Sequence, residues 1–242
     1  MYREALIAEN ARFAALVGEV DHATPIPTCP GWDVVKLLRH LGRGHRWAAT
    51  MVENRATEAL DPLEVPGGKP PADLDGTVAW LRESAAAVPA AVDAVGPDAP
   101  VWTFTGPKPA EWWIRRRLHE ETVHRADLQL AVGREIDLAP ELAVDGLSEW
   151  LDLLVERGGV GASMSADLHL HATDTDDGAG EWTIRPDGGG LAWEPGHGKA
   201  AAAVRGPAAL LFLALVRRVP LERLEVFGDR TVVEDFLAAT PF

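Results

Sequence analysis

The sequence has a single cysteine, Cys29, among its 242 residues. One thiol cannot form an internal disulfide, and it cannot build a zinc cluster of cysteines. Any metal ion in this protein must therefore be held by histidine and carboxylate side chains. No apolar run reaches the roughly 18 residues that cross a bilayer, and the N-terminus lacks the apolar core of a signal peptide. We therefore expect a cytoplasmic protein without a membrane partner.

Positive charge is also scarce. The chain has 23 Lys and Arg against 37 Asp and Glu, which gives a formal net charge of −14. Nucleic-acid binding needs a cationic surface, so this balance argues against a nucleic-acid partner and favours small-molecule partners. The hydrophobic fraction of 47% is enough for the core of one large domain or two modest ones.

Apolar residues follow helical spacing over the first two thirds of the chain. Asp33 is suited to cap the second predicted helix, and Gly133 is suited to stop the fourth. Pro89 is expected to end or kink the third. The predicted helices cover about residues 2–20, 33–55, 74–95, 110–132 and 140–157.

Beyond about residue 160 the pattern changes. The segment from Leu168 to Thr173 alternates apolar and polar side chains, which is typical of a half-buried strand. We therefore predict a helical domain of residues 1–158, followed by a smaller α+β domain of residues 159–242. In this second domain, strands are predicted near 168–173, 182–185, 190–193, 201–205 and 224–227, and helices near 207–218 and 229–238.

The fourth predicted helix concentrates acidic and imidazole side chains within two turns. Glu120 and His124 are four residues apart, so they lie on one helix face and can both reach one metal ion. Glu121 is three residues from His124 and could replace Glu120, and His119 is a third possibility. Spacing alone does not choose among them, and a solvated ion pair is the alternative interpretation of such a group.

A third ligand is available from the second predicted helix. His40 shares a helix face with Leu37, Gly44 and Trp47, so we expect it to point inward. A buried histidine satisfied by hydrogen bonds is the alternative. His45 lies roughly 140° further round the helix, and we expect it at the rim or the surface.

Several arginines are candidates for binding carboxylates, because a guanidinium group pairs with a carboxylate through two hydrogen bonds. Arg115, Arg116 and Arg117 are consecutive, so at least one of them must face solvent. Asp127 follows His124 by three residues and could hold its imidazole as a hydrogen-bond acceptor. A helix-surface salt bridge with a nearby arginine is the alternative for Asp127.

Several other histidine, cysteine and tryptophan residues could suggest a functional site, but we interpret them as structural. His169 and His171 point to the same side of their strand, but the outer face of an antiparallel sheet is polar by default, so we assign them no metal. Cys29 is predicted to be a small buried residue beside a turn. Three tryptophans are expected in the core or at the mouth of a pocket: Trp102, Trp112 and Trp113.

These motifs resemble the mycothiol-dependent maleylpyruvate isomerase family of actinobacteria. The resemblance rests on Cys29-Pro30-Gly31-Trp32 with His40-Leu41, then Trp113, Arg117-Leu118-His119-Glu120 and Val123-His124-Arg125-Ala126-Asp127. For the C-terminal part it rests mainly on Val204-Arg205-Gly206-Pro207-Ala208 and Val226-Phe227-Gly228-Asp229. It implies a DinB-like, metal-binding four-helix bundle joined to a small α+β domain, over nearly the whole chain.

The resemblance also implies a site. The metal ligands of the family fall on His40, Glu120 and His124, and the metal is expected to be zinc with an open fourth position, although nickel, manganese or iron also accept such ligands. Mycothiol is the implied cosubstrate. As a metal-bound thiolate it would add to the double bond of a maleylpyruvate-like enedioate, so that the resulting single bond can rotate.

The resemblance leaves two further residues as candidates. Arg205 is our candidate for stabilising the enolate that thiol addition produces, and Arg117 is our candidate for binding the cofactor. The leading hypothesis is a cis-trans isomerase. The alternatives are a mycothiol S-transferase acting on another electrophile, and a non-enzymatic protein that binds a metal or a small molecule.

Overall fold

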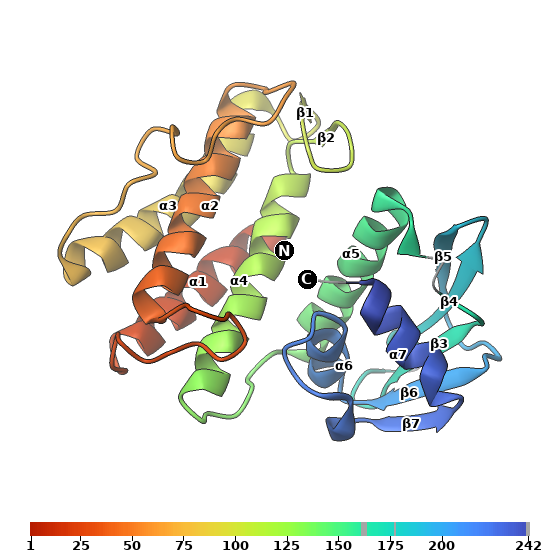
Figure 1. The fold of residues 1–242 in the computed structure, drawn as a ribbon. Coiled ribbons are helices and arrows are strands. Elements are labelled where there is room, and N and C mark those ends of the chain that lie inside the picture. The colour runs from red at the N-terminus through yellow and green to blue at the C-terminus, as the bar shows by residue number, and fades with distance from the viewer. Residues whose placement is uncertain (161–163, 177, 241–242) are drawn as a thin grey trace. The chain divides into compact units, whose positions relative to one another are not determined.

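A computed structural model describes residues 1–160, 164–176 and 178–240 of the chain. The chain divides into two compact units, Met1–Glu135 and Ile136–Phe242, and Figure 1 traces both. The first unit is helical and the second combines helices with a sheet. The predicted fold class is therefore confirmed. Among the described residues, no helix has the length and apolar composition needed to cross a bilayer.

The first unit contains four helices, and their bounds agree closely with those predicted from apolar spacing. Two of them begin at an aspartate that accepts a backbone hydrogen bond: Asp33 caps the second helix through Lys36 N at 2.7 Å. The third helix continues past Pro89 to Val95, so Pro89 does not end it. The elements are α1 (Tyr2–Val17), α2 (Val34–Glu53), α3 (Leu74–Val95) and α4 (Trp112–Ala131), with the short strands β1 (Pro100–Val101) and β2 (Lys108–Pro109) before α4.

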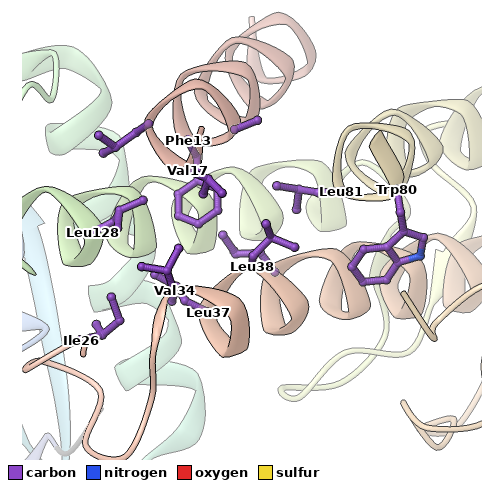
Figure 2. Packing of buried hydrophobic residues seen from close by; sticks show 12 residues of the cluster. Phe13, Val17, Ile26, Val34, Leu37, Leu38, Trp80, Leu81 and Leu128 are labelled. Atoms are coloured by element: carbon purple, nitrogen blue, oxygen red, sulfur yellow. The ribbon is translucent and has the colours of Figure 1, made fainter. Parts of the chain in front are cut away.

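The core of this unit lies where the four helices face one another, as Figure 2 shows. Burial of these large apolar side chains is the main force that holds the helices together. Gly42 of α2 lies directly against Trp80 of α3, since a Cβ atom at this glycine would be 2.1 Å from the indole ring. The labelled residues of this core are Phe13, Val17, Ile26, Val34, Leu37, Leu38, Trp80, Leu81 and Leu128.

The second unit is a mixed sheet with helices, in agreement with the predicted α+β domain. Its strand order is β5-β4-β3-β6-β7, and only the β3–β6 pair is parallel within this sheet of the described chain. The strands are β3 (Leu168–Ala172), β4 (Glu181–Asp187), β5 (Gly190–Pro195), β6 (Ala202–Gly206) and β7 (Glu225–Gly228). The helices are α5 (Pro140–Arg157), α6 (Ala208–Leu215) and α7 (Arg230–Ala239), with the 3-10 turn η2 (Leu221–Arg223) before β7.

Helix α5 belongs to this second unit. The predicted division after residue 158 differs from the one observed, because it assigned α5 to the N-terminal helices. In the structure Trp182 Nε1 of β4 donates to Ser148 Oγ of α5 at 2.9 Å, and Trp193 Nε1 of β5 donates to Asp152 Oδ1 at 3.1 Å. Helix α5 therefore covers the sheet face that carries these indoles. The alternate residues His169, His171 and Arg205 point to the opposite face.

Candidate metal centre

Helices α2 and α4 bring together three side chains that each offer a nitrogen or oxygen atom to a metal ion. Glu120 Oε2 lies 3.7 Å from His40 Nε2 and 3.8 Å from His124 Nε2. The ring centroids of the two histidines are 4.9 Å apart, and the three potential ligand atoms all lie within 4.8 Å of one another. The structure therefore assembles the triad that the family resemblance implied.

The donor set fits a divalent transition metal. Tetrahedral zinc with bonds of about 2.0–2.2 Å places its ligand atoms about 3.3–3.6 Å apart, so the 3.7 and 3.8 Å separations of Glu120 Oε2 from the two histidines need shrink by only a few tenths of an ångström. Two imidazoles and one carboxylate leave a fourth position for a substrate atom, as in catalytic zinc sites. We therefore regard His40, Glu120 and His124 as the residues able to hold the metal.

Asp127 fixes the orientation of His124. Its Oδ2 atom lies 2.8 Å from His124 Nδ1, and its side chain is fully buried. This contact leaves Nε2 of the imidazole facing Glu120, which is the arrangement expected for a metal-bound histidine supported by a carboxylate. The predicted acceptor role of Asp127 is confirmed, and Arg125 and Arg134 instead pair with glutamates of α1 and the turn after it.

Cys29 is half-buried beside this contact. Its Sγ atom donates to Asp127 Oδ2 at 3.5 Å. Cys29, His124 and Asp127 also form a compact group of possible metal ligands. However, His124 Nδ1 and Asp127 Oδ2 are hydrogen-bonded at 2.8 Å, and His124 Nε2 already faces Glu120 in the ligand group with His40, so we interpret Cys29 and Asp127 as supports for His124.

An Asp127→Asn substitution is expected to weaken zinc binding about 10- to 100-fold, because a neutral amide replaces the charged acceptor that holds His124 Nδ1. The dissociation constant would be measured by competition with a chromogenic chelator. Asp21→Asn is the matched control, since Asp21 is exposed and only accepts a backbone hydrogen bond in its own turn. Equal affinities for both variants would contradict the role of Asp127.

The local charges keep the ligands ready for a cation at neutral pH. Burial lowers the pKa of His40 more than the nearby Glu120 raises it, so the imidazole is neutral. Burial alone would raise the pKa of Glu120, but the adjacent His40 and the charges of Arg116 and Arg117 hold it well below its usual value. Arg116 Nη2 lies 3.2 Å and Arg117 Nη1 3.7 Å from the Glu120 carboxylate.

Glu121 has a different role from its neighbour. Its side chain is fully buried, with Oε2 2.7 Å from His45 Nε2 and Oε1 accepting from Asn10 Nδ2 at 3.2 Å. Glu120 therefore belongs to the ligand group, whereas Glu121 is buried in the interior. His119 is also fully buried and does not belong to the ligand group of His40.

The prediction that His45 lies at the rim was wrong, because the residue is 0% exposed. Helix α2 packs against both α3 and α4, so it buries two faces, and the spacing argument considered only one. Burial above all, and then the charge of Arg117, lower the pKa of His45. Arg117 Nε donates to His45 Nδ1 at 3.3 Å.

A cavity of about 760 Å³ opens beside the ligands in the first unit. His40 is half-buried and faces this cavity, while Trp32 packs against its ring with centroids 4.9 Å apart. His40 was expected to point inward, but its side chain is 40% exposed and lies at the cavity, outside the apolar core. The lining residues are Trp32, Lys36, Arg39, His40, Arg43, Gly44, Trp47, Asp61, Pro62, Leu63, Phe104, Arg117 and Glu120.

Three basic residues of the lining were missed in the sequence. Lys36, Arg39 and Arg43 follow a spacing of three and four residues, as does the adjacent His40, so they form one cationic stripe on α2. This spacing could have identified the three basic residues from the sequence. The Nε atom of Arg39 is buried and has no hydrogen-bond partner among the described residues, which leaves a donor available to an anion.

The aromatic residues that were predicted for the core or a pocket mouth occupy both places. Trp113 is fully buried, and Trp102 and Trp112 are half-buried. They form an edge-to-face cluster with the cavity residues Trp47 and Phe104, with ring centroids 5.0–6.2 Å apart. This cluster gives the cavity an apolar wall.

The two arginines that were assigned functional roles lie in different units. Arg117 is buried, lines the cavity and contacts Glu120. Arg205 is exposed in the second unit, where Nη1 pairs with Glu225 Oε2 at 3.3 Å. The roles assigned to Arg117 and Arg205 stay predictions.

Comparison with known proteins identifies both parts of the chain. A family model for the mycothiol maleylpyruvate isomerase N-terminal domain matches residues 3–129, and a model for the MDMPI C-terminal domain matches residues 141–235. Two uncharacterized Mycobacterium tuberculosis proteins, from different strains, are each 33% identical over 144 residues, which is 56% of this chain and 70% of theirs.

Two crystal structures share the fold of the chain. One is the mycothiol-dependent maleylpyruvate isomerase, at 17% identity and a TM-score of 0.62, and the other is a single-site mutant of such an isomerase, at 15% identity and a TM-score of 0.63. Each comparison covers 93% of this chain and 91% of the other. Identity this low is evidence about the fold alone.

Proposed function

This chain belongs to the mycothiol maleylpyruvate isomerase family, and we propose that it is a metal-dependent enzyme that uses mycothiol to isomerise cis enedioates such as maleylpyruvate. The observation that carries the proposal is the meeting of His40, Glu120 and His124 at the wall of a large cavity. We take zinc as the metal. When bound, it would hold a thiol sulfur as a nucleophilic thiolate at neutral pH.

The protein prepares this site before any ligand arrives. Asp127 keeps the proton of His124 on Nδ1, so that Nε2 is available. Arg116 and Arg117 keep Glu120 ionised. Trp32, Trp47 and Phe104 supply apolar walls around the charged groups.

The cationic stripe of α2 suits a substrate with two carboxylates. Lys36, Arg39 and Arg43 line the same cavity as Glu120, and Arg39 offers a buried Nε donor that no described residue uses. Thiol addition to an enedioate places further negative charge on the substrate, so cations positioned beforehand lower the barrier. We propose that Arg39 binds a substrate carboxylate. In the same scheme, Arg117 binds the thiol cosubstrate.

An Arg39→Gln substitution is expected to raise KM for the enedioate about 10- to 100-fold, because a charge-assisted hydrogen bond to a carboxylate is lost. Metal content should not change, since Arg39 is not a ligand. Steady-state kinetics and elemental analysis would measure the two quantities. Arg82→Gln is the matched control, because Arg82 is an exposed residue of α3. An unchanged KM would remove Arg39 from the substrate site.

The proposed function is tested with the purified protein beside its His40→Ala variant. We expect one equivalent of a divalent metal per chain at this site in the parent protein, and at least a 10- to 100-fold weaker affinity of this site in the variant. Maleylpyruvate conversion that requires mycothiol should be present in the parent and absent in the variant. His22→Ala is the control, since His22 is neither a ligand nor a cavity residue and its Nε2 contacts the backbone oxygen of Val17 at the end of α1.

Three outcomes would contradict all or part of the proposal. Consumption of one mycothiol for each substrate molecule would indicate an S-transferase that keeps the thiol adduct. Metal binding without thiol-dependent turnover of any enedioate or electrophile would contradict the enzyme proposal, and the protein would then be a small-molecule binder. Absence of metal in the parent protein after zinc is supplied would refute the thiolate mechanism.

A further inference from the structure

A second group of possible metal ligands lies in the other unit, on the outer face of its sheet. In the β3–β4 pair, His171 is opposite Glu181 and His169 is opposite Thr183, so the side chains of His169 and Glu181 lie diagonally on one face. His197 follows the last residue of β5 by two positions. The strand register places the side chains of His169 and Glu181 next to each other, and the loop after β5 brings His197 to the same face of the sheet.

The loop that carries His197 is tied down on β4. Gly196 N donates to Glu181 O at 2.9 Å, and Thr183 Oγ1 donates to Gly196 O at 3.3 Å. Gly198 packs so closely that a Cβ atom there would be 2.3 Å from Thr183 Oγ1. The backbone on both sides of His197 is therefore held against the strand, which places its imidazole over Glu181.

The three side chains approach one another closely. Glu181 Oε2 lies 3.1 Å from His169 Nε2 and 2.8 Å from His197 Nδ1. The rings of His169 and His197 are edge to face, with centroids 5.0 Å apart. One ligand atom from each residue lies within 4.8 Å of the others. His171 stands beside the group, 6.3 Å from His169 between ring centroids, and is not a member of it.

His169 has a feature that an ordinary surface histidine lacks. It is only 4% exposed, and neither of its ring nitrogens has a hydrogen-bond partner within the described part of the chain. Although Nε2 is within ion-pair distance of Glu181, the contact does not have hydrogen-bond geometry. Buried polar atoms without partners cost free energy. Burial also lowers the pKa of His169, so its ring is neutral and able to bind a cation.

We propose that His169, Glu181 and His197 form a second site for a divalent transition-metal ion of the zinc type. Two imidazoles and one carboxylate suit zinc, nickel or copper, whereas magnesium and calcium prefer oxygen ligands alone. His197 is 76% exposed, so solvent can supply the remaining ligand position. The ion would satisfy the buried nitrogen of His169 and would link the loop after β5 to strands β3 and β4.

The test uses the full chain with the first site disabled by His40→Ala and His124→Ala. Zinc alone is titrated into this double variant against a competing chelator. We expect one equivalent of bound zinc per chain and a rise in the thermal unfolding midpoint, because an ion that binds only the folded state stabilises it. Adding His197→Ala should weaken that binding at least 10- to 100-fold. His197 is exposed, so its removal leaves the packing of the sheet intact.

His22→Ala and His171→Ala, each added to the same double variant, are the controls and should leave zinc binding unchanged. Absence of bound zinc in the double variant would overturn the proposal. Equal binding with and without His197→Ala would do the same, as would loss of binding on His171→Ala alone. Far-UV circular dichroism verifies that each variant is folded. The result does not depend on the proposed function, because the first site is absent throughout.

Discussion

The Glu120→Ala variant is expected to lose the zinc bound at the candidate metal centre and its thiol-dependent activity while remaining folded. Removal of a ligand should weaken zinc affinity by at least the 10- to 100-fold that a supporting residue contributes. The carboxylate lies 21% exposed at the cavity wall. Water can therefore replace it beside Arg116 and Arg117, and the metal-free protein should lose less than about 2 kcal/mol of stability.

Elemental analysis tests the loss of zinc. Denaturant unfolding of the metal-free protein tests the small loss of stability. His40→Ala is a useful partner because it removes another ligand from another helix, α2 instead of α4. If both are ligands of one ion, each substitution abolishes the same equivalent of zinc. Retention of zinc by Glu120→Ala, with loss in His40→Ala, would mean that Glu120 is not a ligand and that the triad is wrong.

The elements of the fold were predictable because their signals are local. Apolar spacing located the four helices of the first unit, and Asp33 marked the start of α2 through a hydrogen bond that spans three residues. The assignment of α5 was not predictable in the same way. Its sequence shows that one face is apolar, but which partner covers that face depends on long-range packing, which the amphipathic pattern does not encode.

In the candidate metal centre, too, local spacing predicted some features and long-range packing decided the others. Glu120 and His124 were found from helical spacing, but the same spacing also admitted Glu121, and only the resemblance to a family singled out Glu120. His45 was misplaced because α2 buries a second face against α4. The sequence paired His169 with His171 and missed its grouping with Glu181 and His197, since His197 lies in a loop without periodicity and meets its partners only in the folded sheet.

The Glu121→Ala variant is expected to lose about 2–6 kcal/mol of stability, because two buried donors are left without an acceptor at about 1–3 kcal/mol each, a larger loss than at the adjacent Glu120. Arg117 Nε donates to His45 Nδ1, so the neutral ring carries its proton on Nε2 and donates it to Glu121 at 2.7 Å. Asn10 donates to the other carboxylate oxygen. Without the carboxylate, both donors are left in an interior where Glu121 and His45 are 0% exposed.

Denaturant unfolding of the metal-free variant would measure this loss, with Glu19→Ala as the control. Glu19 forms an exposed pair with Arg134, which should contribute no more than about 1 kcal/mol. A similarly small loss for Glu121→Ala would show that the buried contacts to His45 and Asn10 do not stabilise the fold. The expected contrast assigns two consecutive glutamates of α4 to different tasks: Glu120 binds the metal, and Glu121 secures α4 against α1 and α2 so that the ligands from two helices meet.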